Sequence, residues 1–171
     1  MNMAGHQKQT TNHFQRGFTI VELLIVIVVI AILAAIVIVA YNGIQDKARF
    51  AQKRSDIENL QKLVELYYAQ NGSYPDTGLN WKYQAEVGDA FIPGLVPQFA
   101  GSLPKVTDGP TGSVHNNTYV YKSNGTDYKL IRLYQPAIPA GEWSQVPLSM
   151  HDANTGYTDR WGVWSPGGAN I

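Results

Sequence analysis

The sequence predicts an α+β fold in which one long N-terminal helix packs on a small antiparallel β-sheet head. Three observations carry this prediction. All nine prolines and all four tryptophans, with 13 of the 16 glycines, follow residue 71, so the residues before it can form a continuous helix. Every residue from Leu23 to Ala40 is apolar. Two runs of β-forming residues flank Asn124-Gly125, a strong hairpin signal.

Composition excludes several classes of chemistry. The 171 residues contain no cysteine, so disulfides, thiolate zinc sites and cysteine nucleophiles are excluded. Thirteen basic and 13 acidic residues give a net charge of zero, so the charge of the whole protein does not favour binding of nucleic acid or of an acidic substrate.

Changes in composition divide the chain into three parts. Residues 1–17 are polar and contain Lys8 and Arg16 but no acid, which is typical of a leader peptide. Residues 18–70 are predicted as the long helix, and residues 71–171 as the globular head. The boundary lies where Gly72 offers a helix C-cap and Pro75 forbids continuation.

The first half of the helix, residues 18–41, has the composition of a membrane span. Its 18 consecutive apolar residues approach the roughly 20 that a spanning helix needs. The alternative is a secretory signal cut near Ala34-Ala35 or Ala40. Such signals have apolar cores of about 7–15 residues, so a retained membrane or assembly segment is favoured.

The second half of the helix is amphipathic. Apolar residues recur with the period of a helix and predict one stripe that packs on the head: Phe50, Ile57, Leu60, Leu63, Val64 and Tyr67. Between them lie charged residues that we expect on a solvated face: Asp46, Lys47, Arg49, Lys53, Arg54, Asp56, Glu58, Lys62 and Glu65.

The head is predicted from its turn signals. Thr118 to Tyr134 forms the hairpin, and Trp143–Leu148 and Trp161–Trp164 are expected to add short strands. Residues 76–117, rich in proline and glycine, are expected to form an irregular connection with one short helix.

The sequence contains none of the common catalytic or phosphate-binding motifs, so we expect neither an enzyme nor a cofactor. Asp152, Asn154 and Asp159 resemble half of a calcium loop. No glutamate closes that loop, so a turn rich in Asp and Asn is favoured and no metal site is predicted.

The stretch RGFTIVELLIVIVVIAILAAIVIVAYNGIQDKARFAQ resembles the N-terminal signature of type IV prepilins and related pseudopilins. The resemblance is dense over residues 15–50 and looser through residue 75. It implies the type IV pilin-like fold and cleavage after Gly17 by a prepilin peptidase on the cytoplasmic side. The same enzyme would N-methylate Phe18, and Glu22 would become the fifth mature residue.

Glu22 is the one carboxylate at the front edge of the apolar run. In a packed bundle of such helices it would lie among apolar neighbours and need a cation. Lys8 and Arg16 leave with the leader, so the nearest candidate is the new α-amine of Phe18, in the same or in a neighbouring subunit. We therefore expect Glu22 to act in assembly.

The resemblance implies a structural subunit, major or minor, of a type IV pilus. Its partners would be other pilins, the prepilin peptidase and the assembly machinery. It would cross the cytoplasmic membrane once before assembly and reach the cell surface afterwards. Basic residues are more numerous after the apolar run than before it, which alone would favour the opposite orientation.

Two alternatives remain at this point. The first is a pseudopilin of a type II secretion system. The second is a membrane-anchored DNA- or sugar-binding module in which Lys47, Arg49, Lys53 and Arg54 contact phosphates. These four residues are spread around a helix, so nucleic acid is not expected as a specific partner.

Overall fold

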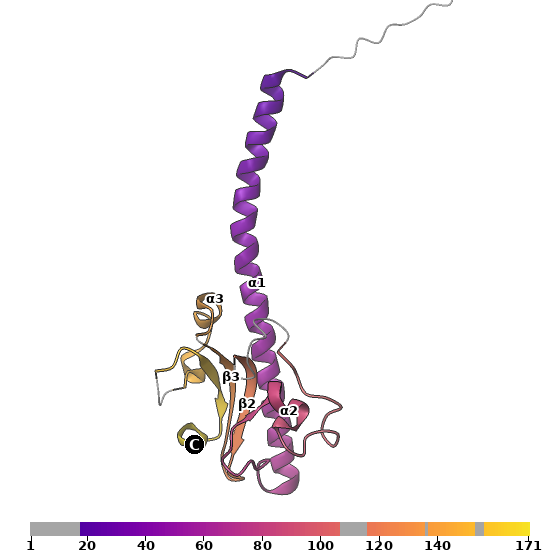
Figure 1. The fold of residues 1–171 in the computed structure, drawn as a ribbon, viewed down its shortest axis with the longest axis vertical. Helices are drawn as coiled ribbons and strands as arrows, with labels where there is room; N and C mark the ends of the chain where they lie inside the picture. Colours follow the sequence, from indigo (N-terminus) through magenta and orange to yellow (C-terminus); the bar gives the residue numbers. More distant parts are fainter. Residues whose placement is uncertain (1–17, 107–115, 136, 153–155) are drawn as a thin grey trace, which may run out of the picture. The chain divides into compact units, whose positions relative to one another are not determined.

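The computed structural model of the chain describes residues 18–106, 116–135, 137–152 and 156–171. Its elements are one long helix, a four-stranded antiparallel sheet and several short helical turns (Figure 1). This arrangement confirms the predicted α+β, pilin-like fold class. The leader, with Gly17, lies outside the described residues.

The long helix α1 runs from Ile20 to Asn71. It ends where the sequence predicts, because Gly72 adopts a φ of 73° and donates its backbone N–H to the Tyr68 carbonyl oxygen at 2.8 Å. Only glycine enters this left-handed conformation without steric cost. Among the described helices, α1 alone has the length and hydropathy to cross a membrane.

Contacts within the chain define two compact units, which divide between residues 41 and 42. In the first unit, the described apolar side chains up to Ile38 are exposed. The second unit, residues 42–171, is called the globular unit below. It contains the C-terminal part of α1 together with the sheet, so the amphipathic helix half belongs to the same packed body as the strands.

The sheet has the order β1-β2-β3-β4, with every neighbouring pair antiparallel. Its strands are β1 (Lys82–Tyr83), β2 (Asn117–Ser123), β3 (Tyr128–Tyr134) and β4 (Arg160–Trp164). In the middle of the sheet, Val120 of β2 pairs with Ile131 of β3, which pairs with Gly162 of β4. Side chains alternate between the two faces along each strand, so residues two apart share one face of the sheet.

One face of the sheet packs on α1 and forms the main core (Figure 1). Phe50, Ile57, Leu60 and Val64 of the predicted stripe are buried there, against Tyr119, Tyr121, Tyr128, Leu130 and Trp161 of the sheet. Leu63 and Tyr67 pack at the edge of this cluster. The helical period of the stripe predicted this packing correctly.

One local prediction for the head is wrong. Residues Trp143–Leu148 form no strand: α3 covers Ala140–Trp143, and the turn η2 covers Leu148–Met150. Pro139 and Pro147 precede these turns and fix the φ angle that starts each of them. The predicted strand at Trp161–Trp164 is confirmed as part of β4.

The hairpin turn is longer than the Asn-Gly signal suggests, because Ser123 pairs with Tyr128 across four intervening residues. The Asn124 side chain explains the length, since its Oδ1 accepts hydrogen bonds from the backbone of Thr126 and Asp127 at 3.0 and 2.7 Å.

In its described residues, the connection before β2 holds three short elements: β1, α2 (Gln84–Val87) and the turn η1 (Gly88–Phe91).

Candidate assembly site

Residues Thr19 and Glu22 form a reciprocal cap at the start of α1. The Thr19 backbone N–H and hydroxyl both donate to Glu22 Oε2, each at 2.8 Å. The Glu22 backbone N–H in turn donates to Thr19 Oγ1 at 3.2 Å. This is a capping box, which satisfies helix N–H groups that have no partner within the helix.

The cap gives Glu22 a role that the sequence analysis missed. A threonine three residues before a glutamate and an apolar run is the sequence signature of a capping box, so the signal was available. In the uncut chain the nitrogen of residue 18 is an amide and carries no charge, and Thr19 is the partner that holds the carboxylate.

The predicted site residues fall at the same end of the helix. Phe18 is 85% exposed and directly precedes the cap, while Glu22 is exposed in the first turn of α1. Gly17 lies outside the described residues, so the cleavage position stays a prediction. In the structure the Glu22 side chain contacts Thr19, which directly follows Phe18, the expected new N-terminal residue.

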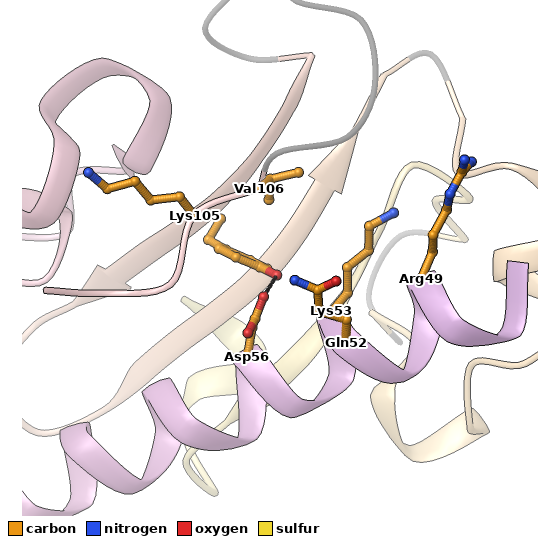
Figure 2. A pocket seen from close by; sticks show the side chains of 7 residues that line it. Arg49, Gln52, Lys53, Asp56, Lys105 and Val106 are labelled. Atoms are coloured by element: carbon orange, nitrogen blue, oxygen red, sulfur yellow. Dashed lines mark hydrogen bonds between the residues drawn. The ribbon is translucent and has the colours of Figure 1, made fainter. Parts of the chain in front are cut away.

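A pocket of about 230 Å³ lies between α1 and β2 in the globular unit (Figure 2). Within it Tyr119 donates its hydroxyl to Asp56 at 2.8 Å. Burial raises the pKa of Asp56 by more than this hydrogen bond lowers it. The pocket is lined by Arg49, Gln52, Lys53, Asp56, Lys105, Val106 and Tyr119.

Two of the four basic residues considered for phosphate contact, Lys53 and Arg54, are held in ion pairs within the chain. Lys53 is 6% exposed and pairs with Glu142 at 2.8 Å. Arg54 pairs with Glu58 on the exposed helix surface at 2.7 Å. In Figure 2 the Arg49 side chain points away from Asp56. The described residues around this pocket therefore offer no continuous cationic groove of the kind that binds a nucleic acid strand.

Lys53 belongs to a buried polar network, and its placement on a solvated face was wrong. Glu142 of α3 accepts hydrogen bonds from Lys53 Nζ at 2.8 Å and from Trp161 Nε1 at 3.1 Å. Arg132 Nε lies 3.9 Å from the same carboxylate. Lys53 and Glu142 are 89 residues apart in the chain, and periodicity within a helix cannot predict a partner at that distance.

The candidate calcium loop already contains cationic partners. Asp152 pairs with Lys129 at 3.0 Å, and both side chains are buried. Asp159 holds the Arg160 guanidinium through two bonds of 2.8 and 3.1 Å. Asn154 lies outside the described residues. Among the residues that the structure does describe, no group of three metal-ligating side chains converges.

Comparison with known proteins identifies the N-terminal segment. Residues 12–38 match the model of the prokaryotic N-terminal methylation motif, which covers the Phe18–Glu22 site. The chain is 32% identical over 113 residues to the type II secretion system core protein G of Escherichia coli K12. That alignment covers 65% of this chain and 74% of the relative. This chain belongs to the prepilin family of pilins and pseudopilins.

Other relatives of this prepilin come from both branches of the family. Fimbrial protein EcpC of Eikenella corrodens is 28% identical over 118 residues, which are 66% of this chain and 77% of that protein. Core protein G of Pectobacterium carotovorum is 38% identical over 63 residues, which are 37% of this chain. The prepilin spans 40% of the length of that relative and 44% of the length of core protein G of Klebsiella michiganensis. No solved structure matches it.

Proposed function

We propose that this prepilin is a structural subunit of a pilin-type filament, built through its apolar N-terminal helix. The capped Glu22 at the start of α1 carries the proposal, together with the methylation motif that surrounds it. A carboxylate beside a long apolar run is costly in a membrane and marks a functional site. The globular unit offers no catalytic constellation in its described residues, and we propose no enzymatic activity.

Processing changes the partners that are available to Glu22. Cleavage after Gly17 would turn the amide nitrogen of Phe18 into an α-amine, which is cationic at neutral pH. Before cleavage, the Thr19 bonds hold the carboxylate in a defined orientation and satisfy the helix terminus. After cleavage, Glu22 can pair with this amine or with that of a neighbouring subunit. The pair would set the register between helices that are otherwise uniformly apolar.

The apolar N-terminal segment also supports a proposal for where the chain lies in the cell. We propose that residues 18–41 cross the cytoplasmic membrane once before assembly, with the globular unit outside, and that assembly carries the subunit to a surface filament. The apolar helix and the fimbrial relative support this placement. The prepilin peptidase and the assembly machinery of the membrane are the proposed partners.

A second candidate is a subunit of a secretion pseudopilus. The relatives named core protein G of the type II secretion system favour it. Both candidates require the same cleavage and the same helix packing, and they differ in the machinery that drives assembly.

Filament formation tests the proposal. The full chain is expressed with a prepilin peptidase and, in parallel strains, with a pilus or a secretion assembly system. We expect filaments sheared from the cells to contain the chain in at least one strain, as seen by immunoblot and electron microscopy. A strain without the peptidase is the control and should retain the chain in the membrane fraction. A chain that stays in the membrane in every strain would contradict the proposal.

A further inference from the structure

Four tyrosine rings form a continuous chain between the surface of the globular unit and its core. Tyr68 of α1 is 42% exposed, whereas Tyr121 and Tyr128 of the sheet are fully buried. The ring centroids of Tyr68 and Tyr74 lie 4.5 Å apart, and those of Tyr74 and Tyr128 lie 4.7 Å apart. Tyr128 in turn stacks on Tyr121 at 6.1 Å. Tyr74 therefore connects an exposed ring to the buried ones.

The outer two rings, Tyr68 and Tyr74, have a geometry that suits a bond between them. Their planes are inclined by 32°, closer to face-to-face than the 64° at which Tyr74 meets Tyr128. Both residues are held in place, because Tyr68 lies in the last turn of α1 and the Tyr74 backbone N–H donates to the Gly125 carbonyl oxygen at 2.8 Å. Two groups that are held side by side react as if within one molecule, without the entropic cost of an encounter.

Glu65 supplies a proton acceptor beside these rings. The Tyr74 hydroxyl donates to Glu65 Oε2 at 3.3 Å, and the Tyr128 hydroxyl donates to Glu65 Oε1 at 3.0 Å. Partial burial and the neighbouring Glu65 charge raise the pKa of Tyr74 to about 12, so this phenol is uncharged at neutral pH. An uncharged phenol that loses an electron also loses its proton, and Glu65 lies where it can accept that proton.

Sulfur groups offer little competition for an oxidant at the surface of residues 18–171. Cysteine is absent, and Met150, the one methionine after residue 17, is 8% exposed. Thiols and thioethers are side chains that oxidants commonly attack. An exposed tyrosine such as Tyr68 is therefore open to one-electron oxidants without an exposed sulfur group to intercept them.

We propose that Tyr68 and Tyr74 form an oxidative cross-linking site, at which a one-electron oxidant of the peroxidase or high-valent metal class joins the two rings as dityrosine. The product ties the last turn of α1 to the segment that is bonded to Gly125. Both residues belong to the same globular unit, so the cross-link does not depend on filament assembly.

The reaction balances within the two phenols and the oxidant. Each phenol gives one electron to the oxidant, and the Tyr74 proton moves to Glu65 while the Tyr68 proton moves to water. The two phenoxyl radicals then form one carbon–carbon bond between ring carbons adjacent to the hydroxyl-bearing carbons. The hydrogens of those two carbons move to the oxygens and restore both phenols. The net change is a loss of two electrons and two protons.

Photo-oxidation of the full chain in detergent tests the site. The oxidant is photoexcited tris(bipyridyl)ruthenium(II) with persulfate, which removes single electrons from tyrosine. Trypsin digestion of the monomer band cuts after Lys62 and Lys82, so both tyrosines lie in the peptide 63–82. We expect this peptide to lose the mass of two hydrogens and to show dityrosine fluorescence. Hydroxylamine cuts the Asn71-Gly72 bond, and the two halves should stay joined only after oxidation.

Matched variants identify the two partners. Tyr68→Phe and Tyr74→Phe should each abolish the joined halves, because phenylalanine keeps the ring but has no phenol to oxidise. Tyr157→Phe is the control and should leave their yield unchanged. Tyr157 is 46% exposed, slightly more than Tyr68, and its ring packs against the Arg160 guanidinium at 4.0 Å.

Replacement of the proton acceptor tests the mechanism. Glu65→Gln should slow cross-linking severalfold at neutral pH, because an amide does not take up the Tyr74 proton. An equal rate would contradict the transfer to Glu65.

Three outcomes would overturn the cross-linking site: halves that separate in the oxidised, unmodified chain, joined halves that survive Tyr68→Phe, or a link from Tyr74 to the Tyr128 peptide 123–129 instead. Each of them would leave the proposed function standing, because the test uses the monomer and requires no filament.

Discussion

Replacement of Glu142 by alanine lowers the free energy of unfolding of the globular unit by about 3–5 kcal/mol, the cost of breaking a buried ion pair. Glu142 is the shared acceptor of Lys53 and Trp161, and Arg132 lies beside it. Removal of the carboxylate leaves buried positive charge without its compensating anion. The melting temperature should fall by roughly 10–20 °C.

The measurement is thermal unfolding of the full chain in detergent, followed by near-ultraviolet circular dichroism. All four tryptophans lie after residue 71, so this signal reports on the globular unit and not on the apolar helix.

The adjacent surface pair provides a matched control. Arg54 and Glu58 lie 2.7 Å apart, closer than the 2.8 Å between Lys53 and Glu142, but their side chains are 49% and 44% exposed. Glu58→Ala should cost only about 0.3–0.5 kcal/mol, because exposed pairs at this helix spacing are screened by water. Equal losses from Glu142→Ala and Glu58→Ala would show that burial does not determine the strength of the pair.

Replacement of Glu22 by glutamine separates its two roles. Glutamine at this position keeps the capping box with Thr19 but removes the negative charge, whereas Glu22→Ala removes both. If assembly depends on pairing with the Phe18 amine, both variants should be cut normally and both should lose filament incorporation by about tenfold or more, which is the range for close charge pairs.

The readouts are the processed fraction on immunoblots and the amount of subunit in sheared filaments. Thr19→Ser preserves the hydroxyl of the cap and should assemble as the unmodified chain does. Normal filaments from Glu22→Gln would show that the cap, and not the charge, is what assembly requires.

Local signals predicted much of the fold. The stripe from Phe50 to Val64, the Gly72 cap and the Trp161–Trp164 strand each depend on a few neighbouring residues and were read correctly. Sequence reasoning failed where the partner lies far along the chain. The Lys53–Glu142 pair joins residues that only the folded chain brings together.

At the candidate sites too, features that depend on neighbouring residues could be read from the sequence, and contacts between distant residues could not. The Gly17-Phe18 junction and Glu22 were predicted from a contiguous motif, and the cleavage and assembly roles of these residues stay predictions. The Thr19 cap was also readable, because a threonine three residues before a glutamate is a known signature. The contact of Asp56 with Tyr119 could not be read in this way, because the two residues lie 63 positions apart in the chain.

The N-terminal peptide of the mature chain tests most directly that this prepilin is processed and then assembled through its new terminus. The chain is recovered from filaments, digested and measured by mass spectrometry. We expect a peptide that starts at Phe18 and carries one added methyl group on its amine. A peptide that starts at Met1, or at a site near Ala35 or Ala40, would contradict it.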